Sequence, residues 1–185
     1  MAMPGATASR GRGRTCPRWL LAPAMLVLAA CSSSDPPPCP EAGTLADAAR
    51  IVAFRDGGRD LTDKRFEVRI TDVAVACEVD RDDDGQTVRA EMKLRFDAEK
   101  GPANADESAK FRYFVAITDA QRNVLKRKAF DARISLPGNT TRTQAIETLS
   151  PTLPLKPDAN PANYRFLVGF ELTRAQLRYN RNNPL

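Results

Sequence analysis

The chain contains no histidine, and it has only four cysteines among its 185 residues. Histidine is the commonest general base and a member of the Ser-His and Cys-His nucleophile pairs. These catalytic pairs are therefore excluded, as are zinc sites that need histidine. The sequence also lacks the Gly-Lys-Ser/Thr phosphate loop and the Gly-x-Gly-x-x-Gly dinucleotide motif. Catalysis would have to use carboxylates, tyrosine or lysine, and no spacing singles out such a pair. We therefore expect a protein that is not an enzyme and uses no cofactor.

Long apolar runs are also scarce, and the single one lies near the start of the chain. Residues 19–30 carry no charge, but these 12 residues are too few for a membrane-spanning helix, which needs about 20. Four arginines precede the run, at positions 10, 12, 14 and 18. A cationic head, a short apolar run and small residues at its end are typical of a secretory signal peptide, which we predict over residues 1–30.

The run ends in Leu28-Ala29-Ala30-Cys31, which resembles the lipobox of bacterial lipoproteins. In a lipobox the cysteine is lipidated and the chain is cut just before it. The resemblance therefore implies that fatty acyl chains anchor Cys31 in a membrane. Ser32 occupies the position at which an aspartate favours the inner membrane of many species, so we expect attachment to the outer membrane, on its periplasmic face. A short buried helix that opens a cytoplasmic domain is the alternative.

Cleavage before Cys31 would remove most of the net charge of the chain. The full sequence has a formal charge of +5, whereas the chain from Cys31 onward keeps 24 of the 28 basic residues and all 23 acidic ones, a net charge of +1. This balance gives no electrostatic reason to expect a nucleic-acid partner. The remaining charge is uneven, with −5 over residues 31–125 and +6 over residues 126–185. Such polarity either orients the domain on a charged partner or belongs to a solvated face.

The cysteine count leaves one pair. Cys16 is lost with the signal peptide and Cys31 is consumed by lipid, so Cys39 and Cys77 remain. An exported protein enters an oxidising compartment, where two such thiols usually form a disulfide. We therefore predict a disulfide between Cys39 and Cys77. Two unpaired buried thiols are the alternative.

Residues 31–40 form a tether rich in serine and proline, and beyond it short segments with strand-like patterns follow one another. These segments cover residues 51–55, 66–79, 88–96, 111–118, 124–136, 143–149 and 164–172. Turn residues separate them. The pattern predicts an all-β domain over residues 41–185, an antiparallel sandwich of about seven strands resembling immunoglobulin or fibronectin type III modules. A small barrel is the alternative. A helical turn capped by Thr44 is expected before the first strand.

The two longest segments can be set in register as a hairpin. When paired residue numbers add up to 167, apolar residues face one side, with Val79 opposite Val88 and Cys77 opposite Ala90. The other side then carries oppositely charged pairs, Glu78 with Arg89 and Asp72 with Arg95. The connecting loop in this register covers residues 81–86.

The turn of this hairpin is acidic. It reads Asp80-x-Asp82-x-Asp84-Gly85, and Glu91 follows at the spacing of a calcium-binding EF-hand loop. An EF-hand loop lies between two helices, whereas both flanks here alternate with period two. In an extended strand Glu91 would also lie too far along the chain to complete the ligand shell. We therefore expect a solvated turn and no metal site. Weak calcium binding at the three aspartates is the alternative.

Two basic clusters are candidate contact surfaces. Lys126 and Lys128 share a strand face with Phe130 and Ile134, and we interpret them as protection of an edge strand before we interpret them as a binding patch. The last segment predicts a short helix capped by Thr173. Its arginines share one face and its apolar residues another: Arg174, Arg178 and Arg181 against Leu172, Ala175 and Tyr179. The arginine face either sits where the helix dipole favours cations or binds phosphate headgroups or an acidic partner.

Three stretches of the chain stand out together. They are Pro38-Cys39-Pro40 with LADAAR at residues 45–50, YFVAITD at residues 113–119, and VGFELT at residues 168–173 running into QLRYNR at residues 176–181. These stretches resemble a family of small uncharacterised lipoproteins found mainly in alphaproteobacteria. The resemblance covers most of the chain after the signal peptide. It implies a location in the envelope, and it supplies no activity and no catalytic residue.

Together these features predict a lipid-anchored envelope protein whose non-catalytic β-sandwich binds or braces another envelope component. The expected partners are the membrane, through the lipid anchor, and an envelope protein or an anionic surface. A periplasmic protein that binds a small ligand or calcium is the first alternative. An enzyme that uses carboxylates on a glycan is the second.

Overall fold

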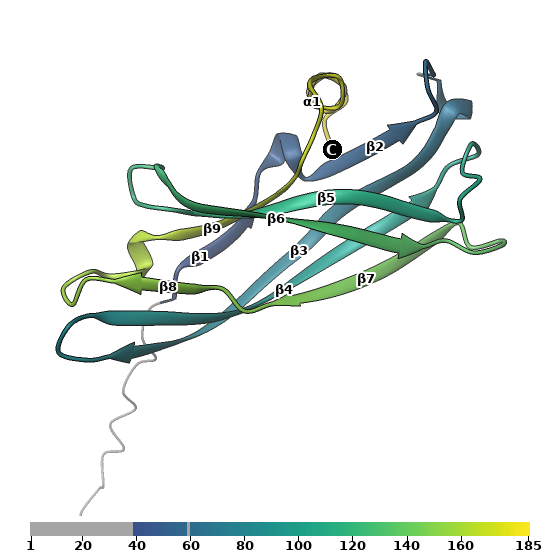
Figure 1. Cartoon of the computed structure of the whole chain (residues 1–185). Coiled ribbons are helices and arrows are strands. Elements are labelled where there is room, and N and C mark those ends of the chain that lie inside the picture. Colours follow the sequence, from purple (N-terminus) through teal and green to yellow (C-terminus); the bar gives the residue numbers. More distant parts are fainter. Residues whose placement is uncertain (1–38, 59) are drawn as a thin grey trace, which may run out of the picture. The chain divides into compact units, whose positions relative to one another are not determined.

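Alternating apolar side chains build two β-sheets that pack face to face (Figure 1). The computed structural model describes residues 39–58 and 60–185, which lie within one compact unit. One sheet has the strand order β1-β9-β5-β6, and the other has the order β2-β3-β4-β7, with β8 also paired to β4. The predicted signal peptide, the lipidation site Cys31 and the tether up to residue 38 lie outside the described residues.

The elements have the following bounds. The strands are β1 (Glu41–Thr44), β2 (Arg50–Phe54), β3 (Lys64–Arg81), β4 (Gln86–Lys100), β5 (Ser108–Thr118), β6 (Val124–Ser135), β7 (Arg142–Leu149), β8 (Thr152–Leu155) and β9 (Arg165–Phe170). The helices are the 3-10 helices η1 (Ala46–Ala48), η2 (Leu61–Asp63) and η3 (Pro161–Asn163) and the α-helix α1 (Arg174–Asn182). No helix in the described part of the chain has the length and apolarity needed to cross a membrane.

Inward-facing residues of both sheets form one apolar core. On β4 every second residue from 88 to 98 is buried, because successive side chains of a strand point to opposite faces. The ring of Phe96 on β4 lies 5.2 Å from that of Tyr113, 5.5 Å from Phe111 and 6.1 Å from Phe170, measured between centroids. Since β5 and β9 belong to the opposite sheet, this aromatic cluster joins the two sheets.

The predicted antiparallel sandwich is confirmed, with nine strands in the described residues where about seven were expected. The additional strands are β1 and β8, each of four residues. Both lack the usual strand signature, because β1 contains Gly43 and β8 contains Pro154, residue types that strand interiors disfavour. The connectivity also differs from that of an immunoglobulin constant domain, which places strands A, B, E and D in one sheet. Here β2, β3 and β4 follow one another as neighbours.

The β3–β4 hairpin has the register predicted from the sequence. Residue numbers in every pair from residue 72 to residue 81 add up to 167. The loop is shorter than expected and covers only residues 82–85, because Arg81 and Gln86 still pair with each other. A bulge next to Ile70 shifts the register beyond this region, and the apolar alternation alone does not mark its position.

The turn before β2 lies where it was predicted, but the prediction of its cap was wrong. Thr44 is the last residue of β1 and pairs with Val168 of β9. Leu45 occupies the N-cap of η1 and makes no side-chain capping hydrogen bond. The parallel pairing of β1 with β9 therefore outweighs the local capping preference of threonine.

Helix α1 begins at the predicted cap. The Thr173 hydroxyl accepts a hydrogen bond from the backbone N–H of Gln176 at 3.2 Å, and the Gln176 side chain accepts one from the Thr173 N–H at 2.9 Å. The predicted apolar face is confirmed only in part, because Leu172 and Tyr179 are half-buried whereas Ala175 is exposed. The inner side of the helix also contains the buried Asn180, a polar residue that apolar periodicity does not predict.

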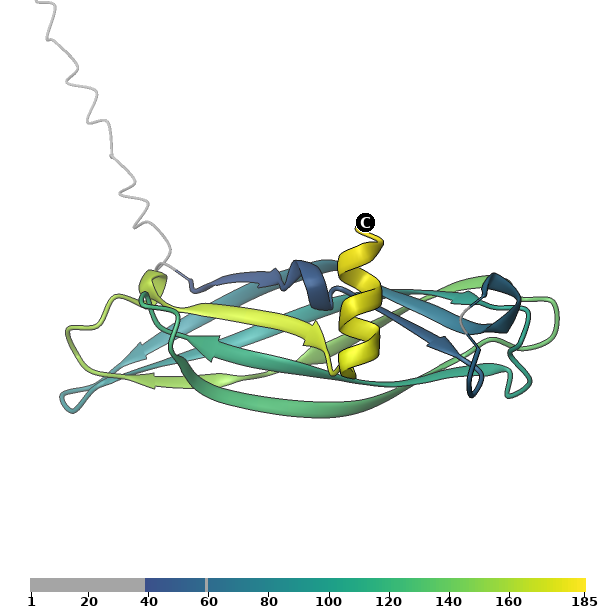
Figure 2. The ribbon, with the colours of Figure 1, turned by 90° about the horizontal axis from the view of Figure 1, so that it is seen from above.

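The buried pair Asn180 and Arg50 fixes α1 on the sandwich. The Asn180 side-chain amide donates hydrogen bonds to the carbonyl oxygens of Asp47 at 2.9 Å and Arg50 at 2.7 Å. In return, Arg50 Nε donates to Asn180 Oδ1 at 3.3 Å. The ring of Tyr179 packs edge-on against Phe54 at 5.4 Å. Figure 2 shows the result, with α1 lying beside η1 and β2.

The predicted disulfide between Cys39 and Cys77 is present, with 5.8 Å between the two Cα atoms. Cys39 lies just before β1, and Cys77 is an inward-facing residue of β3. Because β1 and β3 belong to different sheets, the bond ties the two sheets together on one side of the sandwich.

Loss of this bond should destabilise the domain. For Cys77→Ser we expect the free energy of unfolding to fall by about 4 kcal/mol, since the bond closes a loop of 38 positions and restricts the unfolded chain. Urea unfolding of the oxidised protein measures the change. A reducing agent should destabilise the unmodified chain by a similar amount and leave Cys77→Ser unaffected. Equal stability of the unmodified chain with and without reductant would contradict this role.

Candidate binding site

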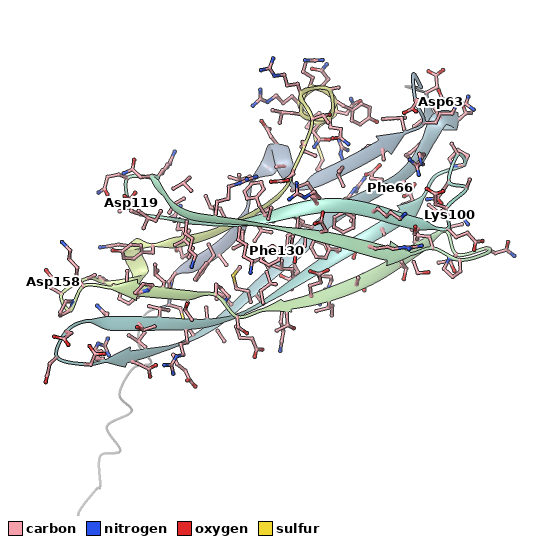
Figure 3. All side chains as sticks on the ribbon, viewed as in Figure 1. Asp63, Phe66, Lys100, Asp119, Phe130 and Asp158 are labelled. Carbon is pink, nitrogen blue, oxygen red and sulfur yellow. A yellow bond between two sulfur atoms is a disulfide. The ribbon has the colours of Figure 1, made fainter. Side chains whose placement is uncertain are left out.

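The two long sides of the sandwich are covered by different elements. On one side lie β1, the disulfide, η1 and α1. On the other side β6 ends one sheet, while β7 and β8 end the other. Inward-facing residues on this second side remain partly accessible, namely Phe130, Glu147 and Leu149, and Figure 3 marks Phe130 there. We call this side, between residues 126–130 and residues 147–152, the seam.

The seam contains a pocket of about 340 Å³, at the small end of the range of about 300–1,000 Å³ for ligand pockets. Its wall comes from β5, β6 and the junction of β7 with β8: Val115, Ile117, Lys126, Lys128, Phe130 and residues 148–152. Pro151 interrupts the strand at this junction, because proline has no N–H for a ladder. Its carbonyl still accepts a hydrogen bond from the Ala90 N–H at 3.0 Å.

The two lysines reach the pocket because of strand alternation. In the β5–β6 register Lys128 lies opposite Val115 and Lys126 opposite Ile117, both of which are buried. The ammonium nitrogen of Lys128 lies 5.1 Å from the centroid of the Phe130 ring. The prediction that both lysines share a face with Phe130 on an edge strand is therefore confirmed.

The intervening Arg127 points to the opposite face of the sheet. Its guanidinium lies 4.2 Å from the centroid of the Phe114 ring and 2.9 Å from the Glu171 carboxylate. Glu171 also pairs with Arg112 at 3.0 Å. The basic run 126–128 is thus divided between two surfaces, and only its lysines belong to the seam.

Tyr113 connects the two sheets at the inner end of the seam. Its ring is buried and stacks on Phe130 with 5.2 Å between centroids, and its hydroxyl donates a hydrogen bond to Glu147 on β7. Burial, together with the hydrogen bond to this carboxylate, raises the pKa of Tyr113 well above its ordinary value. The sequence analysis missed this pair, since 34 positions separate the two residues and no local pattern links strands of different sheets.

The raised pKa of Tyr113 should make stability depend on pH under alkaline conditions. Above pH about 10 the unfolded chain loses the phenolic proton whereas the folded chain keeps it, so the free energy of unfolding falls as the pH rises. In Tyr113→Phe this contribution is absent, and the alkaline fall should be shallower than in the unmodified chain. Urea unfolding of both proteins at a series of pH values tests this. Parallel curves for the two proteins would contradict it.

The acidic turn does not form the arrangement of an EF-hand. Asp82 Oδ1 accepts hydrogen bonds from the N–H groups of Asp84 at 3.2 Å and Gly85 at 2.7 Å. Asp80 pairs with Arg89 at 2.8 Å, and Glu91 lies within β4 and pairs with Lys93 at 3.1 Å. The predicted hairpin is thus confirmed, and residues 39–58 and 60–185 contain no metal-ligating group of three or more acidic or cysteine side chains.

The predicted arginine face is partly neutralised. Arg181 Nε lies 2.7 Å from the Asp47 carboxylate. Arg174 and Arg178 are exposed, and neither forms an ion pair with a described residue. This face lies on α1, which packs against β2 and η1 on the side away from the seam.

No family model, curated protein or solved structure matches this chain. The resemblance to small lipoproteins therefore stays a prediction. The seam combines a pocket, an apolar wall and two cationic side chains.

Proposed function

We propose that this chain is a lipid-anchored envelope protein whose β-sandwich binds another envelope component at the seam and catalyses no reaction. The observation that carries the proposal is the apolar pocket at the seam, into which Lys126 and Lys128 project from an edge strand. The motif that ends in Cys31 supports the anchor, and Ser32 supports the outer membrane as its location. The resemblance to small envelope lipoproteins agrees with this assignment.

Binding accounts for the chemistry of the seam better than catalysis does. The pocket wall offers ammonium groups and apolar surface. Tyr113, whose pKa is raised, stacks on Phe130, and its hydroxyl is already engaged in the hydrogen bond to Glu147. With no histidine in the chain, a proton shuttle at the seam would need another general base.

Cross-linking in intact cells tests the seam. A photoreactive residue at Leu149, a half-buried, inward-facing residue of the pocket wall, should capture an envelope component. The same residue at Ile146, which is exposed on the outward face of β7, should not. Charge reversal by Lys126→Glu with Lys128→Glu should reduce capture from position 149, because it inverts the charge at the pocket.

Arg133→Glu is the matched control for this experiment. Arg133 is exposed on β6, at an odd-numbered position that faces the other side of the strand from the two lysines. Its reversal should therefore leave capture unchanged. Identical adducts from positions 146 and 149, or equal loss of capture with Arg133→Glu, would refute the seam as the binding site.

The anchor has a separate test. In Cys31→Ser no thiol remains to accept lipid, so we expect loss of acylation and a failure of normal cleavage. Metabolic labelling with a radioactive fatty acid and sequencing of the N-terminus measure these two results. Cys16→Ser, which alters only the signal peptide, should be acylated and cleaved normally. A mature N-terminus other than Cys31 in the unmodified protein would refute the anchor.

A further inference from the structure

The lining of the seam pocket is positively charged. It contains the two lysines and no carboxylate, and within the described part of the chain neither ammonium group forms an ion pair. Glu147, the carboxylate of the seam, is outside this lining and accepts a hydrogen bond from Tyr113. The opposing wall comes from residues 148–152. Ammonium groups form charge-assisted hydrogen bonds with a carboxylate or a phosphate. One end of the pocket therefore fits an anionic group.

The rest of the pocket fits hydrocarbon. Val115 and Ile117 belong to β5, which is paired on both sides, to β6 and to β9, so this wall offers no free backbone hydrogen bonds. Phe130 and Leu149 complete the apolar surface. An alkyl chain needs no hydrogen bonds and gains from every apolar contact, whereas a polar ligand would leave its own groups unpaired.

The same lysines make a peptide strand a poor occupant. Lys126 and Lys128 point inward along the edge strand, an arrangement that opposes pairing with a further strand. A strand added to β6 would also place its own side chains against two ammonium groups. Charge and shape at the seam thus favour an amphipathic anion over an extended peptide.

The size of the site indicates one alkyl chain. A volume of about 340 Å³ lies at the lower limit for pockets that enclose drug-sized ligands, which leaves no room for a lipid with two chains. Just before Lys126, Val124 is 60% exposed and Leu125 is 52% exposed. They extend apolar surface along β6 beyond the pocket.

We infer that the seam pocket binds a long-chain fatty acid, with its carboxylate at Lys126 and Lys128 and its alkyl chain against Val115, Ile117 and Phe130. This inference rests on the proposed function, because it names the chemistry of the component bound at the seam. It adds that the recognised group is a single acyl chain with an anionic end.

Binding of palmitate tests the inference. The full lipoprotein, kept in solution by a nonionic amphipol so that no detergent competes, is titrated with palmitate by calorimetry. We expect saturable binding of one palmitate per chain. Hexadecanol has the same alkyl chain without the charge, and its affinity should be lower than that of palmitate by a factor of about ten or more. Acetate, the headgroup alone, should show no measurable binding.

Variants locate the site. Lys126→Gln with Lys128→Gln removes both charges and should weaken palmitate binding by about tenfold or more, whereas Arg133→Gln should not change it. Ser150→Trp keeps both lysines and fills the pocket, so it should abolish binding. Circular dichroism of each variant checks that the fold is intact. If the double-glutamine variant folds and binds palmitate as tightly as the unmodified chain, the inference is wrong.

The outcomes separate this inference from the proposed function. If palmitate does not bind and position 149 still captures an envelope protein in cells, the fatty-acid inference fails and the seam function stands. If palmitate does not bind and position 149 captures nothing, both fail. Lipid adducts at position 149 together with palmitate binding support both.

Discussion

Packing of aromatic rings between the two sheets is the interaction on which the rest of this structure depends. Phe96 of one sheet contacts Phe111, Tyr113 and Phe170 of the other, and large buried rings contribute most to the free energy of a small core. This contact fixes the distance between the sheets and the orientation of β5. It therefore also fixes where the inward-facing residues at the other end of β5, Val115 and Ile117, meet the open side of the sandwich.

A sandwich has edge strands on both sides, and in this chain one side is covered whereas the other is left open. One side carries the disulfide and α1, where buried Arg50 and Asn180 satisfy each other and the nearby carbonyls. Such polar contacts stabilise a buried interface only when every group finds a partner. The other side has no covering element in the described residues and keeps its inward residues accessible. The binding that we propose is thereby assigned to the side where β5 and β4 already order the backbone.

The sequence predicted those parts of the fold that depend on neighbours along the chain. The β3–β4 register followed from strict alternation and from opposite charges facing each other, and the Thr173 cap followed from local hydrogen-bonding chemistry. Strands β1 and β8 were not predicted, because Gly43 and Pro154 have little intrinsic strand preference. These two strands form only through pairing with β9 and β4, which are distant in the sequence. For the same reason the cap at Thr44 was misassigned.

The candidate site was only half visible in the sequence. Lys126, Lys128 and Phe130 share a face because side chains of a strand alternate between its two faces. Charged residues on an otherwise apolar face then indicate an edge strand. The opposing wall at residues 148–152 lies on another sheet, so no spacing along the chain connects it with the lysines. Tyr113 and Glu147 were missed for the same reason, since their hydrogen bond exists only after the two sheets pack.

Edge protection and ligand binding are compatible uses of the same two lysines. An inward-facing ammonium group on an edge strand repels a further strand because burying it without a counter-charge costs several kcal/mol. A fatty acid brings that counter-charge, and at the seam both ammonium groups can keep contact with water while they pair with it. The alkyl chain then packs against the buried side chains of Val115 and Ile117 and covers Phe130, which the open edge leaves half-buried. The inward-facing lysines that disfavour an extended peptide are thus the same groups that favour a fatty acid.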